Sequence, residues 1–437
     1  MSKLEPTNEA SAIAEQGGGT TKVEQLIQQY CPDGVEYKSI ESVTKSICSG
    51  LNPRKNFTLN GKGAICYYLT VKEMTTGKIV FSDKTDKITP DAVNTIQNRS
   101  RLETDDILLS GIGTIGKVAI VDIPVDNWNC SESVLLLKPK KEIIYPKYLK
   151  YILEGNETQA YFNFHATGST LKGIRQKDLR THFIPVPPLP VQEEIVRILD
   201  TLTELQAELQ AELQKRKQQY EYYRDKLLSF SDLGNWGRNV SVEWKKLGDV
   251  ADLLSGFPFD STQFTKEGVR LMRGVNIKRG QLCFNENDDR YWKSTAGLEK
   301  YIVDENDIVI SMDGSLVGKS FGMVKKEHLP LLLVQRVARI RSSVFNINFI
   351  YHCINNWFPN YVDKKKTQGA IPHISMNDIA NFPIPSPSLE EQEKIASILD
   401  RFDTLTTDIT AGLPAEIEAR RKQYEYYRDK LLTFKKK

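Results

Sequence analysis

Arginine, lysine, asparagine and glutamine side chains are frequent in two stretches of the sequence, residues 45–100 and 255–300, and just beyond them. These residue types hydrogen-bond both to phosphate oxygens and to the base edges of DNA. For any one such residue alone, an ordinary solvated surface position is the simpler interpretation. Taken together, they give a set of candidate DNA-binding residues: Arg54, Lys55, Lys62, Lys117, Arg273, Lys278, Arg279 and Lys319.

Other kinds of chemistry find little support. Residues 111–117 read Gly-Ile-Gly-Thr-Ile-Gly-Lys, which matches a dinucleotide-binding fingerprint by letter, but a strand-like stretch follows where that fingerprint needs a helix. We interpret it as a hairpin turn near a DNA surface. The sequence has no phosphate-binding loop and no Asn-Pro-Pro-Phe type methyltransferase motif. The cysteines are scattered and the histidines isolated, so we predict no catalytic, cofactor-binding or metal-binding residue.

The composition is that of an ordinary globular protein, with 437 residues, 26% charged residues and a net charge of +3. So small an excess of positive charge neither requires nor excludes a nucleic acid partner, because basic and acidic faces can balance. We find no signal peptide and no apolar stretch long enough to span a membrane. We therefore expect a cytoplasmic protein with reduced thiols, and a disordered polar tail over residues 1–21.

The sequence contains a long internal repeat. Residues 220–228 and 424–432 both read Tyr-Glu-Tyr-Tyr-Arg-Asp-Lys-Leu-Leu, and shorter matches in the same order precede each block. The chain is therefore two tandem copies of one module. The ends of the copies match closely, whereas residues 45–100 and 255–300 barely match. A fixed frame that carries two different reading heads explains this pattern; simple drift after duplication is the alternative.

Each copy begins with short strand-like segments and ends in a long helix. The first helix follows the prolines of residues 185–190 and meets no breaker until about residue 231, which gives about 57 Å at 1.5 Å per residue. Its one-sided apolar stripe requires a partner helix, which the second copy supplies. The candidates for this helix pair or for a subunit interface are Leu199, Leu202, Leu209, Tyr220, Tyr223, Leu399, Phe402, Ile409, Tyr424 and Tyr427. For the tyrosine blocks, helix packing and a partner-binding face are equally good interpretations.

Residues 202–213 contain a four-residue repeat, Leu-Thr-Glu-Leu-Gln-Ala-Glu-Leu-Gln-Ala-Glu-Leu. Each unit advances a helix by about 400°, so the leucine stripe turns by about 40° per unit. This is typical of a helix that coils around another.

These features resemble the specificity subunits of Type I restriction–modification enzymes. The resemblance covers nearly the whole chain after about residue 22 and rests on the proline-led helices, the paired tyrosine blocks and the four-residue repeat. The repeat and the Leu-Pro-Ala-Glu-Ile stretch at 413–417 look most like the subgroup called Type IC. The Gly-rich extension before residue 22 departs from the family pattern.

The resemblance implies a non-catalytic chain of the α+β class, in which two tandem target recognition domains are joined by two long antiparallel coiled-coil helices with pseudo-two-fold symmetry. It implies a bipartite, asymmetric double-stranded DNA target and, as partners, two modification (methyltransferase) and two restriction (motor-nuclease) subunits, which bring S-adenosylmethionine, ATP and magnesium. The expected division is a tail at 1–21, recognition domains at 22–184 and 233–384, and spacer helices at 185–232 and 385–437.

The alternative class is an enzyme with its own methyltransferase or nuclease activity, which binding of S-adenosylmethionine by the isolated chain would indicate. A purely structural coiled-coil adaptor is the third possibility, but it leaves two large globular heads without a task.

Overall fold

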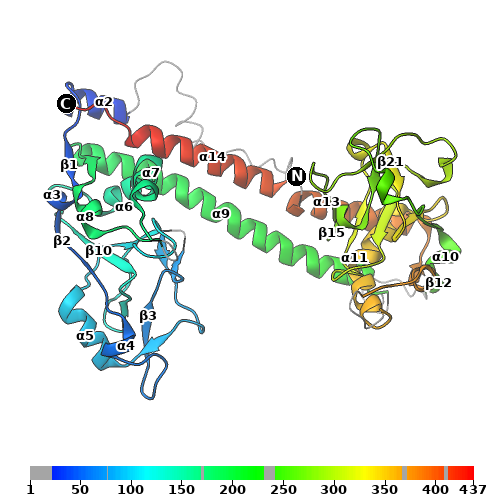
Figure 1. Cartoon of the computed structure of the whole chain (residues 1–437), viewed down its shortest axis with the longest axis horizontal. Helices are drawn as coiled ribbons and strands as arrows, with labels where there is room; N and C mark the ends of the chain where they lie inside the picture. The colour runs from blue at the N-terminus through cyan, green and yellow to red at the C-terminus, as the bar shows by residue number, and fades with distance from the viewer. Residues whose placement is uncertain (1–21, 76, 169–171, 231–241, 367–371, 408–411) are drawn as a thin grey trace. The chain divides into compact units, whose positions relative to one another are not determined.

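The computed structural model of the chain describes residues 22–75, 77–168, 172–230, 242–366, 372–407 and 412–437 (Figure 1). The expected disordered tail lies outside these residues. The chain divides into two compact units. Unit 1 consists of residues 1–208 together with 417–437, and unit 2 consists of residues 209–416. The boundaries between the units, at 208/209 and 416/417, fall inside the long helices. The division expected from the sequence instead assigns each long helix whole to a segment of its own.

Unit 1 is built on a four-stranded antiparallel sheet in the order β2-β10-β7-β8 and a three-stranded sheet in the order β6-β3-β9. Two short pairs, β1-β11 and β4-β5, complete its strands. The strands are β1 Tyr37–Ser39, β2 Thr44–Ser49, β3 Cys66–Leu69, β4 Met74–Thr75, β5 Lys78–Ile79, β6 Lys87–Ile88, β7 Ile107–Ser110, β8 Val118–Ile120, β9 Trp128–Cys130, β10 Val134–Pro139 and β11 Phe183–Pro185. The helices before α9 are α2 Lys22–Tyr30, α3 Ile40–Val43, α4 Pro53–Asn56, α5 Pro90–Ser100, α6 Pro146–Glu154, α7 Asn156–His165 and α8 Gln176–Thr181.

Unit 2 has a four-stranded antiparallel sheet in the order β13-β22-β19-β20 and a second sheet in the order β17-β14-β21-β18. Its strands are β12 Glu243–Lys246, β13 Asp252–Ser255, β14 Val269–Met272, β15 Ile277–Lys278, β16 Gln281–Leu282, β17 Tyr291–Trp292, β18 Ile302–Val303, β19 Ile308–Ser311, β20 Phe321–Met323, β21 Leu331–Leu333, β22 Val337–Arg341 and β23 Pro383–Ser386. Its helices are α10 Leu247–Val250, α11 Ile347–Asp363, α12 Met376–Ala380 and α13 Leu389–Thr407, with 3-10 turns at η2 Ser261–Gln263, η3 Gly274–Asn276, η4 Glu299–Tyr301 and η5 Lys326–His328.

The two heads have the same internal fold. The sheet β2-β10-β7-β8 corresponds strand for strand to β13-β22-β19-β20, and the pair β1-β11 corresponds to β12-β23. Each second sheet contains one parallel pair, β3 with β9 in unit 1 and β14 with β21 in unit 2. The prediction that both copies adopt one α+β fold is therefore confirmed. The two-fold axis between them stays a prediction.

Helix α9, Leu189–Leu228, is the long helix expected from the sequence. It begins one residue before Pro190, although the prolines were expected to lie outside it. A proline is tolerated in the first turn of a helix because the N–H it lacks would have no partner there.

The second expected long helix is two helices, α13 and α14 (Leu413–Leu432). The expectation of one continuous segment over 385–437 is wrong in this respect. Pro414 lies in the first turn of α14, and a proline inside a continuous helix would clash with the preceding turn. Within unit 1, α14 runs antiparallel to the first part of α9. Within unit 2, α13 runs antiparallel to the last part of α9 (Figure 1).

Each identical tyrosine block packs on the head of the other copy. Leu432, at the end of the second block, is buried in the unit 1 core with Ile195 and Leu199 of α9. Tyr220 and Leu228, from the first block, are buried in the unit 2 core with Leu399. The candidate interface residues Leu199, Leu202, Tyr220 and Leu399 are thus core residues.

Candidate nucleic-acid interface

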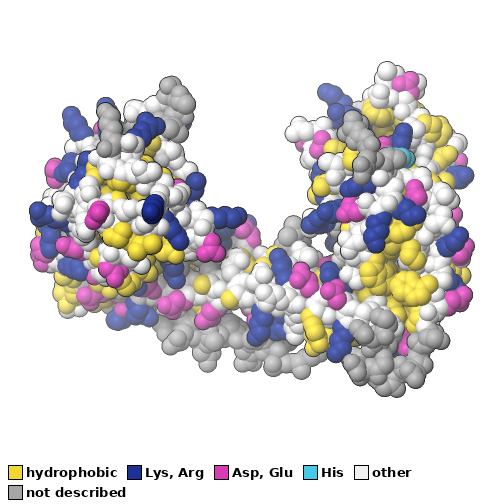
Figure 2. Space-filling model, turned by 90° about the horizontal axis from the view of Figure 1, so that it is seen from below, with side chains coloured by type: hydrophobic (Ala, Val, Ile, Leu, Met, Phe, Trp, Pro, Cys, Tyr) yellow, Lys and Arg dark blue, Asp and Glu magenta, His cyan; other side chains and the backbone are white. Residues whose placement is uncertain are grey.

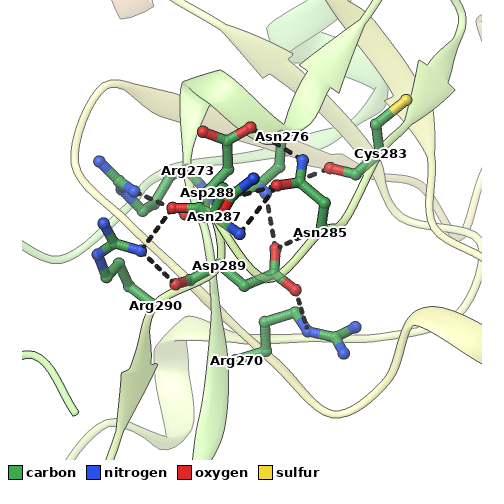
Figure 3. A network of polar contacts seen from close by, with 9 residues as sticks. All are labelled: Arg270, Arg273, Asn276, Cys283, Asn285, Asn287, Asp288, Asp289 and Arg290. Carbon is green, nitrogen blue, oxygen red and sulfur yellow. Dashed lines mark hydrogen bonds and ion pairs between the residues drawn. The ribbon is translucent and has the colours of Figure 1, made fainter. Parts of the chain in front are cut away.

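A network of polar side chains organises the second sheet of unit 2 (Figure 3). At its centre, the buried carboxylate of Asp289 accepts a hydrogen bond from the Asn276 side-chain amide at 3.2 Å and one from the Asn285 backbone N–H at 3.2 Å. Arg270 Nε lies 3.2 Å from the other carboxylate oxygen as an ion pair, and its guanidinium lies over the ring of Phe284. The network fixes the loop between β16 and β17 against β14.

Arg273, a candidate DNA-binding residue, belongs to this network. Its Nη1 donates to the backbone carbonyl of Asp288 at 2.9 Å, and its guanidinium lies 5.9 Å from the centre of the Phe264 ring. The side chain is half-buried. Arg273 therefore holds the loop in place, although a guanidinium has five N–H donors and can contact a phosphate as well.

Lys278 and Arg279 lie beside this network on the β15-β16 hairpin, and both are exposed. The hairpin is anchored at its base, where the Asn276 amide donates to the carbonyl of Cys283, and at its tip, where Tyr351 Oη donates to the carbonyl of Gly280. Two exposed cations on a fixed hairpin suit phosphate contact, because little backbone freedom remains to be lost on binding.

The candidates of unit 1 are more scattered. Arg54 and Lys62 are exposed and lie in the segment before β3, whereas the side chain of Lys55 lies outside the described residues. Arg54 lies in α4, whose N-cap Asn52 accepts from the Arg54 backbone N–H at 3.2 Å. The short helix thus presents Arg54 on a defined backbone.

Lys117 follows the turn between β7 and β8 and lines a cavity of about 670 Å³ within unit 1. Its Nζ donates to the carbonyl of Val71 at 3.2 Å. Lys150 and Glu154 form an ion pair at 3.1 Å on the wall of the cavity, where burial raises the pKa of Glu154 above its ordinary value. Arg428 of α14 also lines it. The charges of this wall are mixed, so they do not specify a ligand.

Lys319 occupies the corresponding place after the β19-β20 turn and is half-buried. The structure therefore brings Arg273, Lys278 and Arg279 into one region of unit 2 and leaves the other candidates apart. Figure 2 shows lysine and arginine side chains mixed with acidic ones on the visible face of both units, without one continuous basic patch.

The residues 111–117 form the turn between β7 and β8, as predicted, and no helix follows them. The equivalent turn in unit 2 carries Asp313, whose carboxylate contacts Arg336 and His373. The sequence did not single out this group, and His373 was treated as an isolated residue. The three residues lie on separate loops, so only the register of the strands could have brought them together.

The tyrosine blocks contain both packed and exposed residues. The rings of Tyr220 and Tyr223 lie 6.2 and 5.7 Å from that of Phe402. Tyr222 and Tyr426, in contrast, are 60% and 61% exposed. Of the remaining interface candidates, Leu209, Tyr424 and Tyr427 are half-buried, and Ile409 lies outside the described residues.

In the part of the chain that the structure describes, no group of three or more histidine, cysteine, aspartate or glutamate side chains could hold a metal ion. None of the helices described is both long and apolar enough to cross a membrane. All six cysteines are described, and each has a free thiol. Burial raises the pKa of the Cys130 thiol to about 12, which keeps it protonated and unreactive.

Two stretches of the chain, residues 32–216 and 239–419, match the model of the Type I restriction modification DNA specificity domain. The chain belongs to this family. Each matched stretch covers one head and part of the helical segment that follows it, in agreement with the repeat. The Type IC subgroup stays a prediction.

Individual family members are moderately similar in sequence. The specificity subunit of the Escherichia coli enzymes EcoR124I/EcoR124II is 35% identical over 273 residues, which cover 58% of this chain and 61% of that subunit. A putative type I specificity subunit of Mycoplasma pneumoniae is 30% identical over 319 residues, 70% of this chain and 88% of that protein. The match to the E. coli relative thus spans less than two thirds of its length.

Solved structures of the family share the fold. The Type-I restriction-modification S subunit of M. genitalium aligns over 92% of this chain and 97% of its own, with a TM-score of 0.57 and 17% identity. A chain from a study of complex assembly and conformational transition of the type I R-M system aligns over 92% of this chain and 98% of its own, with a TM-score of 0.58 and 18% identity. The specificity-domain fold therefore extends through both heads.

Proposed function

We propose that this chain is the DNA-recognition subunit of a Type I restriction–modification complex, in which each unit reads one half of a bipartite, asymmetric target. The observation that carries the proposal is the pairing of one backbone frame with two different sets of loop residues. The four-stranded main sheets of the two heads have the same strand order. Their loops carry different charged and aromatic side chains, which is what two half-sites of different sequence require.

The chain itself carries no catalytic group in this proposal. Methyl transfer, translocation and cleavage belong to the modification and restriction subunits, which bring S-adenosylmethionine, ATP and magnesium. The chain contributes the choice of DNA sequence and the surface on which those subunits assemble.

The two modification subunits dock, in this proposal, on the exposed side of the two tyrosine blocks. Tyr222 and Tyr426 are equally exposed, and a lysine lies over each ring, Lys226 at 5.7 Å and Lys430 at 6.0 Å. Packing does not constrain exposed side chains, and the exposed positions before each block differ between the copies, for example Gln218 against Lys422. Two identical exposed surfaces suit two copies of one partner, since exposed aromatic and cationic residues are frequent binding anchors.

A head exchange tests the proposal. Replacing residues 45–180 by the equivalent region of a relative should change one half of the DNA target and leave the other half unchanged. The measurement is sequencing of methylated adenines in DNA from a host that carries the exchanged subunit and its modification subunit. A change in both halves would contradict independent reading heads.

The repeat at residues 202–213 acts as a spacer in the same proposal. Deleting residues 206–209 removes about 6 Å of helix and rotates the remainder of the helix by about 40°. One base pair of DNA rises about 3.4 Å and turns about 34–36°, so the rotation matches one base pair. We expect both half-sites to persist with the gap between them one base pair shorter. An active enzyme with an unchanged gap would exclude the spacer role, and loss of folding would mean that the segment serves only for packing.

A further inference from the structure

Three loops meet at one exposed edge of each head, and the same backbone hydrogen bonds join them in both units. In unit 1, the N–H of Gly111 donates to the carbonyl of Ser133 at 2.8 Å, and the N–H of Ile174 donates to that of Gly111 at 2.9 Å. In unit 2, the N–H of Met312 donates to the carbonyl of Arg336, and the N–H of Ile374 to that of Met312, both at 2.9 Å. The loops at this edge are therefore joined in the same way in both units, and we call this arrangement the frame.

The strand register fixes which residues correspond. Val134 pairs with Ser110 in unit 1, and Val337 pairs with Ser311 in unit 2, so Ser133 corresponds to Arg336. Isolated bridges join Ile112 to Gly173 and Asp313 to His373. The frame thus carries Ile112, Ser133 and Gly173 in unit 1, and Asp313, Arg336 and His373 in unit 2.

The unit 2 side chains form a compact polar group. Arg336 Nη1 lies 3.4 Å from Asp313 Oδ1 and 3.3 Å from His373 Nδ1, and the Asp313 carboxylate also contacts His373. The Arg336 side chain is 55% exposed. Within the described part of the chain, neither its Nη2 nor its Nε makes a further hydrogen bond. Nη1 is therefore anchored by two contacts, and Nη2 and Nε remain as donors.

The backbone of Arg336 is also unusual. It has a φ of 71°, in the left-handed region that residues with a bulky side chain rarely adopt. Such conformations persist where the surrounding structure holds them, and they are frequent at functional sites. Here the Met312 N–H bond and the adjoining strand β22 hold the turn.

We propose that Arg336 reads a guanine in the half-site bound by unit 2, with Asp313 as the residue that positions its guanidinium. This inference rests on the proposed function. An arginine fork donates to O6 and N7 of guanine in the major groove, which is the commonest specific protein–DNA contact. A carboxylate that fixes one side of the fork reduces the freedom lost on binding. His373 Nδ1 lies 3.3 Å from the same guanidinium nitrogen, Nη1.

The difference between the units supports this assignment. The same two backbone hydrogen bonds join the loops in both heads, and unit 1 forms them without arginine, aspartate or histidine at these positions. Unit 1 instead presents the exposed apolar side chain of Ile112, 42% exposed, and small residues at the other two positions. The frame is retained while the three side chains change, as expected for positions that contact different base pairs.

Selection from a randomised duplex DNA library tests the proposal. The chain, assembled with its modification subunits, is incubated with the library, and bound sequences are read for the wild type and the Arg336→Ala, Arg336→Lys and Asp313→Asn variants. Lys266→Ala is the control, since it removes an exposed positive charge from the same unit.

We expect the wild type to select a two-part sequence. Arg336→Ala should lower the preference for G·C at one position of one part by about tenfold or more. Asp313→Asn should lower it less, at that same position. Arg336→Lys should keep general affinity but lose most of the preference, and Lys266→Ala should keep the preference.

Two results would overturn the proposal while leaving the proposed function intact. One is an unchanged base preference in Arg336→Ala with a two-part sequence still selected. The other is a uniform loss of affinity for all sequences that Arg336→Lys restores, which indicates a phosphate contact. A wild-type complex that selects no sequence would instead contradict the proposed function itself. The thermal stability of each variant, measured in parallel, separates these results from misfolding.

Discussion

The two units hold their helices against their heads at the same positions but with different side chains. In unit 1, Tyr151 Oη donates to Asp200 at 2.6 Å, and Lys147 forms an ion pair with the same carboxylate. In unit 2, the ring of His352 lies 2.7 Å from Asp400. The aspartate is the same in both units, whereas the residue that contacts it differs. Duplicated heads can therefore diverge pair by pair, provided that each half-buried carboxylate keeps a donor.

The strands differ least between the two heads. Where they approach each other, close backbone contacts leave no space for a side chain. A Cβ added at Gly50 would lie 1.8 Å from the carbonyl oxygen of Cys130, and one added at Gly256 would lie 2.3 Å from that of Val334. In each head the glycine follows the edge strand of the main sheet, β2 or β13, at the point where the chain passes close to the backbone of the second sheet. Loop side chains are free of such limits, which is why they carry the differences.

The largest effect is expected where these backbone contacts are closest. Gly50→Ala should destabilise unit 1 by about 3 kcal/mol or more, and Gly256→Ala should destabilise unit 2 somewhat less, because backbone must move in both cases. Gly61→Ala is the control, since its nearest neighbours are Thr58 side-chain atoms at 3.8 Å, and it should cost less than about 1 kcal/mol. Hydrogen exchange of the strand amides in each unit measures the loss. Equal effects of Gly50→Ala and Gly61→Ala would contradict the close backbone contact.

A smaller effect concerns acid stability. His182 is buried and stacked on Tyr161 at 4.0 Å, whereas Phe382 occupies the same place in unit 2. Burial, and then the charge of His165, lowers the pKa of His182 to about 4. Below pH 6.5 the unfolded chain takes up a proton that the folded unit cannot, so the stability of unit 1 falls as the pH drops from 6.5 towards 4. At pH 5 the loss should be about 2 kcal/mol.

Hydrogen exchange at pH 7 and pH 5, corrected for intrinsic rates, distinguishes the units. Between pH 7 and pH 5, the free energy that protects the β7 amides should fall by about 2 kcal/mol more than that of the β19 amides. His182→Phe, which copies unit 2, should remove the difference. Persistence of the acid effect in that variant would show that another group causes it.

The smallest effect is expected at the exposed tyrosines. Tyr222→Ala and Tyr426→Ala should each weaken the binding of one modification subunit by about tenfold, and the double variant should weaken both. Complex masses measured across a concentration series give the two affinities separately. Gln218→Ala, an exposed position at which the copies differ, is the matched control. Loss of both subunits in either single variant would mean that the two blocks do not act separately.

The sequence predicted the features that depend on local pattern or on repetition. The repeated α+β head, the long helix α9 and the hairpin turn at residues 111–117 all follow from periodicity and from the order of matching motifs. From the sequence we expected one spacer helix over 385–437, whereas the structure has α13 and α14, with Pro414 in the first turn of α14. The role of Arg273 could not be predicted, since its partner is the backbone carbonyl of Asp288 on another loop. The same holds for Asp313, Arg336 and His373, which only the strand register brings together.

The exchange of the tyrosine blocks has a consequence for synthesis on the ribosome. Unit 2 is one continuous stretch of chain, so its core residues, Leu228 and Leu399 among them, have all been translated before residue 417. Unit 1 includes residues 417–437, and its core lacks Leu432 until then. The first head to be translated is therefore the last to be completed. A nascent chain that stops early leaves an open apolar surface on unit 1, which marks it for chaperones and proteases.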